Sequence, residues 1–164
     1  MNSDHVAAAG RGGLTPRPVT ILLVEDNEDH AILIRKSLRE NGVVNDVRTV
    51  STGEEALDYL FRRASYADAA AAPRPGLILL DIKLPGLDGI EVLKHIKEDA
   101  RLKTIPVVML TSSAAESDVI ASYGHGVNSY IQKPVDFAQF AATIRNLRLY
   151  WLMVNLPPPE GDAG

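Results

Sequence analysis

The stretch Val19-Thr20-Ile21-Leu22-Leu23-Val24 is almost wholly apolar and leads directly into two carboxylates, Glu25 and Asp26. Three similar apolar runs follow, at Leu77 to Leu80, Ile105 to Leu110 and Val127 to Ile131. Short continuous runs of this kind fit strands that are covered on both faces, as in a parallel sheet. A fifth run, Val43 to Val50, has polar residues interleaved and fits an edge strand.

Helical patterns lie between these runs, and each begins at a polar residue that suits a helix cap. The candidate caps are Asp26 or Asn27, Ser51 or Thr52, Asp88 and Asp136, and a less regular helix is expected at Ala115 to Tyr123. Five strands that alternate with five helices predict an α/β fold with a doubly wound parallel sheet. The flavodoxin-like strand order 2-1-3-4-5 is the natural arrangement for this count.

The composition limits the possible functions. The chain has 164 residues, which suits one domain, and 46% of them are hydrophobic. The net charge of −4, with scattered basic residues, argues against nucleic-acid binding. The absence of cysteine excludes thiolate chemistry and fits a cytoplasmic location. No apolar run approaches the roughly 20 residues of a membrane span.

The chain divides into three segments. Residues 1–18 are rich in Gly and Pro and are expected to form a flexible tail, residues 19–148 form the domain, and residues 149–164 extend it. The extension contains a dense group of apolar residues, with Leu149, Trp151, Leu152 and Met153 as interface candidates. These side chains either fold back onto their own domain or pack on a second copy, and we favour a homodimer.

The expected strand order brings three carboxylates together. Ligands of such sheets bind at the carboxyl ends of strands 1 and 3, which precede Glu25, Asp26 and Asp81. Carboxylates this close repel one another unless a cation lies among them, and Mg²⁺ prefers oxygen ligands. We therefore expect Asp26 and Asp81 to bind Mg²⁺ directly and Glu25 to hold a coordinated water. The backbone carbonyl of Lys83 is the most plausible further ligand.

Two more residues follow strands at the same edge of the sheet. Lys133 follows the fifth strand and suits a second cation, and the hydroxyl of Thr111, after the fourth strand, suits a donor to a phosphoryl oxygen. Taken singly, Glu25 and Asp26 fit a plain helix cap, and Thr111 and Lys133 fit ordinary strand ends. Their joint placement predicts that Asp81 accepts a phosphoryl group.

Four stretches carry a resemblance to a known family. They are Ile21 to Asp26, Leu79 to Gly89, Pro106 to Thr111 and Tyr130 to Pro134. In these stretches the chain resembles the CheY-like receiver domains of two-component response regulators. The resemblance implies that Asp81 is the phosphoacceptor, that Glu25 and Asp26 form the metal site, and that Lys133 contacts the phosphoryl group. It also implies that Thr111 and Tyr130 are switch residues and that the Lys133–Pro134 bond is cis.

A narrower resemblance concerns the long connection from Arg62 to Gly76 and the carboxyl-terminal extension. Both features resemble single-domain regulators that partner bacterial phytochromes. This implies a sensor histidine kinase, of the phytochrome type, as the phosphodonor, and a phosphotransfer or target protein downstream. Since no output domain is expected after the receiver, its own surface is expected to carry the output.

Three rival functions compete with this interpretation. A haloacid-dehalogenase-type phosphatase needs a second Asp two residues after the nucleophile, where this chain has Lys83, so turnover catalysis is not expected. A nucleotide-binding module needs a glycine-rich loop after the first strand, where the chain is acidic. A degenerate receiver that serves as a binding scaffold is disfavoured by the full residue set. Most of the four histidines, His30 among them, are expected at the surface, and none is expected to be a phosphodonor or a metal ligand. Glu116 is expected on a solvated helix face.

Overall fold

The computed structural model describes residues 19–116, 129–149 and 152–153. The expected tail and most of the helix expected at Ala115 to Tyr123 lie outside the described residues. The strands are β1 (Thr20–Val24), β2 (Val47–Val50), β3 (Pro75–Asp81), β4 (Val107–Thr111) and β5 (Ser129–Gln132). The helices are α2 (Glu28–Glu40), α3 (Gly53–Phe61), α4 (Gly89–Glu98) and α6 (Phe137–Asn146), with the 3₁₀ turns η1 (Ala64–Tyr66) and η2 (Ala69–Ala71) between α3 and β3.

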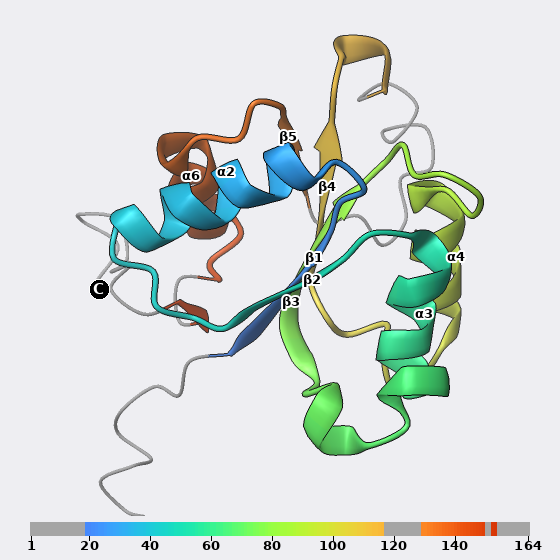
Figure 1. Ribbon diagram of the computed structural model, residues 1–164. Coiled ribbons are helices and arrows are strands. Elements are labelled where there is room, and N and C mark those ends of the chain that lie inside the picture. Colours follow the sequence, from blue (N-terminus) through green and yellow to red (C-terminus); the bar gives the residue numbers. More distant parts are fainter. Residues whose placement is uncertain (1–18, 117–128, 150–151, 154–164) are drawn as a thin grey trace, which may run out of the picture.

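The five strands form one parallel sheet in the order β2-β1-β3-β4-β5, which confirms the predicted topology. Helices α2 and α6 cover one face of the sheet, and α3 and α4 cover the other (Figure 1). Strands β1 and β3 lie side by side in the centre, with Val24 opposite Leu80. The residues that follow this pair, Glu25 and Asp81, therefore emerge together at the carboxyl edge of the sheet.

The helices start where their capping residues predict. The side chains of Asn27, Thr52, Asp88 and Asp136 each accept a hydrogen bond from a backbone N–H in the first turn of their helix. At α4 the cap is reciprocal, because Glu91 also accepts from the backbone N–H of Asp88. These caps fix the direction in which each helix leaves the carboxyl edge of the sheet. None of the helices in the described ranges has the length and apolar character that a membrane crossing requires.

The edge strand β2 is shorter than predicted. The segment before it turns back towards α2, where the N–H of Val43 donates to the carbonyl of Leu38. The Asn45 side chain is buried and donates to the carbonyls of Val19 and Leu152, at 2.9 Å each. The backbone of Val43 is thus directed to α2 and not to β1. Pairing with β1 starts where the carbonyl of Asp46 accepts from the N–H of Ile21, and β2 begins at Val47.

The carboxyl-terminal extension packs on its own domain over the part that the structure describes. Leu152 and Met153 are 3% and 4% exposed and belong to the apolar core between the sheet and helices α2 and α6. The expectation that these two side chains anchor an interface is therefore wrong for the chain as it folds here, because little of either remains for a second copy. Leu149 is partly buried against the same core, and Trp151 lies outside the described residues.

Candidate functional site

Two buried carboxylates stand side by side at the carboxyl edge of the sheet. Glu25 is 2% exposed and Asp81 is 3% exposed, which is unusual for charged residues. The strand register that pairs Val24 with Leu80 delivers both, and the N–H of Ile82 donates to the carbonyl of Leu110 just beyond. Such burial requires a positive partner.

Lys133 supplies that positive charge. Its Nζ lies 2.6 Å from Glu25 Oε1 and 3.0 Å from Asp81 Oδ2, and its side chain is only 11% exposed. Its backbone N–H donates to the carbonyl of Thr111 at 2.7 Å, which ties the end of β5 to the end of β4. The Lys133–Pro134 peptide bond is cis, as the resemblance implies. One ammonium thus joins the two carboxylates.

The carboxylates of Glu25, Asp26 and Asp81 each present an oxygen within 4.8 Å of the others. Asp26 is exposed, and none of the hydrogen bonds or ion pairs among the described residues involves its carboxylate. An all-oxygen set of this kind, with one uncommitted carboxylate, fits a hard divalent cation. The side chains predicted as metal ligands are therefore together. The role of the Lys83 carbonyl as a metal ligand stays a prediction. The Lys83 backbone N–H donates to Asp81 Oδ1 at 3.4 Å.

Burial raises the pKa of Asp81 to about 7; the hydrogen bond from Lys133 lowers it, and the negative charge of Glu25 raises it further. For Lys133 burial acts downward, but hydrogen bonds and charges of Glu25 and Asp81 outweigh it and raise the lysine pKa. The ammonium therefore stays charged at neutral pH, whereas Asp81 needs further positive charge to be fully ionised. A divalent cation would supply it.

The two predicted switch residues differ in exposure. Thr111 ends β4 and is fully buried beside the site, one residue after Leu110, which pairs with Asp81. Tyr130 lies on β5 and is 47% exposed. Thr111 is thus a buried hydroxyl beside Asp81, and Tyr130 is a partly exposed aromatic ring on the neighbouring strand.

Glu116 was expected on a solvated helix face, and this is wrong. It is buried, accepts a hydrogen bond from the N–H of Ser112, and forms an ion pair with Lys83, whose Nζ lies 3.1 Å from Glu116 Oε2. Its own N–H donates to Ser113 Oγ. The spacing Ser113-Ala-Ala-Glu116 is that of a capping box, so the sequence contained a signal for this position.

His30 is a second residue that the sequence interpretation missed. Its Nδ1 lies 3.3 Å from Lys133 Nζ, although 103 positions separate the two residues in the chain. His30 lies three residues after the helix cap Asn27, and its N–H donates to the Asn27 side chain. A residue in the first turn of a helix that starts at the site is the signal that was available.

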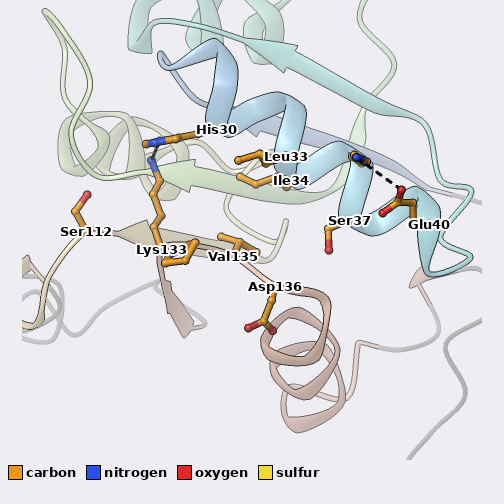
Figure 2. A pocket seen from close by; sticks show the side chains of 11 residues that line it. His30, Leu33, Ile34, Ser37, Glu40, Ser112, Lys133, Val135 and Asp136 are labelled. Atoms are coloured by element: carbon orange, nitrogen blue, oxygen red, sulfur yellow. Dashed lines mark hydrogen bonds and ion pairs between the residues drawn. The ribbon is translucent and has the colours of Figure 1, made fainter.

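A groove of about 640 Å³ opens beside Lys133. Figure 2 shows α2 on one side, with His30, Leu33 and Ile34, and the connection between β5 and α6 on the other, with Lys133 and Val135. Leu33 is 60% exposed, so the groove presents apolar surface to solvent next to the buried charges.

Comparison with known proteins agrees with this geometry. The family model for the response regulator receiver domain matches residues 21–145. The chain is 41% identical to the probable methanogenesis regulatory protein FilR2 of Methanothrix harundinacea, over 86% of this chain and 88% of the relative. It is 39% identical to the response regulator Rcp1 of Synechocystis sp., over 85% of this chain and 94% of the relative.

Solved structures give the same assignment. The bacteriophytochrome response regulator AtBRR superimposes with a TM-score of 0.78 at 44% identity, covering 85% of this chain and 99% of AtBRR. The Mn²⁺-bound form of a response regulator Rcp1 superimposes with a TM-score of 0.66 at 39% identity, covering 85% of this chain and 99% of that one. From the strand order, the carboxylate cluster and these matches, the chain belongs to the response regulator receiver domain family.

Proposed function

We propose that this protein is a cytoplasmic response regulator whose Asp81 accepts a phosphoryl group from a sensor histidine kinase. The observation that carries the proposal is the Lys133 ammonium held between the buried carboxylates of Glu25 and Asp81. A structural salt bridge needs one carboxylate, and burying a second beside it costs stability. The excess negative charge is suited to a metal ion and a phosphoryl group, which is the charge balance that phosphoryl transfer requires.

In the proposed reaction, a carboxylate oxygen of Asp81 attacks the phosphorus of a phosphohistidine. The new P–O bond forms as the P–N bond breaks, and the leaving imidazole takes up a proton. Lys133 neutralises one phosphoryl oxygen, and the hydroxyl of Thr111 donates to another. Glu25, Asp26 and Asp81 would hold Mg²⁺, which supplies further neutralisation of the phosphoryl charge. The protein is then an acceptor that hydrolyses only its own phosphoryl group, rather than a turnover enzyme.

The phosphoryl group is proposed to act as a switch. Once Thr111 turns towards the new acceptor, space opens behind it, and Tyr130 follows from its exposed position on β5. The surface around β5 then differs between the two states and selects a downstream protein. Thr111→Ala is expected to accept the phosphoryl group and to lose this selection.

The groove beside Lys133 is the proposed docking site for the kinase. A donor histidine has to reach Asp81, and the groove combines exposed apolar surface on α2 with Lys133 at its inner end. A helix of the kinase fits a groove of this kind. Because AtBRR is described as a bacteriophytochrome response regulator, we propose a phytochrome as the kinase. We also propose a homodimer, through residues of the extension other than Leu152 and Met153.

The decisive experiment is the intact mass of the protein after incubation with Mg²⁺ and acetyl phosphate. Wild type is expected to gain one phosphoryl group, to lose this gain with EDTA, and to show none in the Asp81→Asn variant. A label that persists in Asp81→Asn would place the acceptor elsewhere. If wild type gains no mass, beryllofluoride, which mimics the phosphoryl group, decides whether the adduct is short-lived or the domain is a degenerate scaffold that binds neither.

A further inference from the structure

The Lys133 ammonium has a third partner besides the two carboxylates. An ammonium carries three N–H donors and no acceptor. Lys133 donates to Asp81 Oδ2 at 3.0 Å, its nitrogen lies 2.6 Å from Glu25 Oε1 in an ion pair, and His30 Nδ1 lies 3.3 Å from the same nitrogen. Figure 2 shows the lysine side chain reaching towards His30 on α2. The ammonium thus donates to Asp81, pairs with Glu25 by charge and meets a ring nitrogen of His30.

The role of the imidazole follows from the chemistry of its partner. Because the ammonium only donates, Nδ1 accepts, and the ring carries its proton on Nε2. The alternative, in which Nδ1 donates to Glu25 Oε2, would have to span 3.9 Å, which is too long for a hydrogen bond.

The position of His30 is itself tied to the site. The backbone N–H of Asn27 donates to Glu25 Oε2 at 3.1 Å, and the Asn27 side chain accepts from the N–H of His30 at 3.0 Å. The ring of His30 then meets Lys133, which returns to Glu25. Glu25, Asn27, His30 and Lys133 thus form a closed circuit of polar contacts that locks the first turn of α2 to the ammonium.

The distances show why such a lock is useful. Glu25 approaches the ammonium at 2.6 Å, closer than Asp81 at 3.0 Å. Without a third contact, the ammonium can shift closer to Glu25 and lengthen its hydrogen bond to Asp81. The contact with Nδ1 of His30, on α2, adds a third point that restrains the nitrogen. The donor that faces Asp81 then stays aimed at the position that a phosphoryl oxygen will occupy.

We propose that His30 is a positioning residue for phosphoryl transfer, which holds the Lys133 ammonium in the orientation that receives the phosphoryl group on Asp81. The inference rests on the proposed function. With acetyl phosphate as donor, the P–O bond to Asp81 forms as the P–O bond to acetate breaks. The proton on His30 Nε2 takes no part, so the residue acts through Lys133 alone.

The test compares labelling rates of four proteins with Mg²⁺ and acetyl phosphate, measured by intact mass over time. His30→Leu keeps a bulky side chain but removes the acceptor, and we expect labelling to slow about threefold to tenfold, the effect of one typical hydrogen bond in net terms. His30→Asn places an amide oxygen at the same number of bonds from the backbone as Nδ1 and should restore the rate to within about twofold. His95→Leu, an exposed histidine on α4, is the matched control and should label as wild type does.

The same pair of variants is then measured in a Lys133→Ala background. If His30 acts through the ammonium, His30→Leu makes no further difference there. Equal rates for wild type and His30→Leu refute the inference while leaving the proposed function intact, and so does equal slowing by the Asn and Leu variants. If wild type neither takes the label nor binds beryllofluoride, the proposed function fails, and the inference fails with it.

Discussion

The two helical layers of this protein differ in how tightly they are packed. On the face covered by α3 and α4, the backbones approach so closely that a methyl group does not fit: a Cβ on Gly53 would clash with the carbonyl oxygen of Leu87. On the face covered by α2 and α6, a groove of about 640 Å³ remains open, and Ile32 and Leu33 on α2 are 50% and 60% exposed.

The difference separates structural surface from binding surface. The α3–α4 layer supports the loop after Asp81: Glu54 at the start of α3 accepts from the N–H of Leu87, and Gly89 at the start of α4 packs against the carbonyl of Asp81. The α2–α6 layer leaves apolar side chains in solvent, where they gain nothing for folding. Exposed apolar groups gathered beside a charged site are typical of a surface that binds a partner.

The largest expected effect comes from adding a single methyl group in the tightly packed layer of α3 and α4. Gly53→Ala forces the Leu87 backbone away, at an overpacking cost of about 3 kcal/mol or more. The helix preference for alanine offsets less than about 1 kcal/mol. Urea unfolding should therefore show a loss of about 2 to 3 kcal/mol. The control is Leu33→Ala in the open layer, expected within about 0.5 kcal/mol of wild type. Equal losses from both would mean that the layers do not differ.

Much of this architecture is encoded locally and was predictable. The apolar runs, the caps at Asn27, Thr52, Asp88 and Asp136, and the placement of Glu25 and Asp81 after neighbouring strands each depend on a few consecutive residues. The chain order of the elements then restricts the sheet order, because crossovers are right-handed.

What sequence analysis missed depends on contacts between distant segments. His30 meets Lys133 across 103 positions, and Asn45 bonds to the Leu152 carbonyl across 107. An amphiphilic residue such as His is ordinary on a surface, and an apolar cluster near a chain end fits a dimer as well as a core. Only the three-dimensional fold shows whether such a residue lies on the surface, in the core or at an interface. The buried Glu116 is different, since its capping spacing was readable.

The carboxyl-terminal extension offers a second test with a somewhat smaller expected effect, because Leu152 and Met153 belong to the core on the side of α2 and α6. Leu152→Ala removes a buried side chain from the core beside α2 and α6 and should cost about 2 kcal/mol in urea unfolding, the low end for such truncations. Sedimentation of the same variant should give the wild-type mass. The opposite pattern, an unchanged free energy of unfolding with a reduced mass, would return Leu152 to a subunit interface. Val44→Ala, an exposed apolar residue 62% open to solvent, controls for general effects.

The smallest expected effect is that of Leu33→Ala on phosphoryl transfer from the kinase. It tests whether a residue of the open layer serves binding without serving folding. Leu33→Ala should leave unfolding and acetyl phosphate labelling unchanged, because the side chain is 60% exposed and offers no polar group to Asp81 or Lys133. Phosphoryl transfer from the cognate kinase should slow roughly fivefold, equivalent to about 1 kcal/mol of lost apolar contact. Val44→Ala, equally exposed but outside the groove, should transfer at the wild-type rate. If both variants slow alike, the groove is not the docking site. If only Leu33→Ala slows, the groove between α2 and the β5–α6 connection is the surface on which the kinase docks.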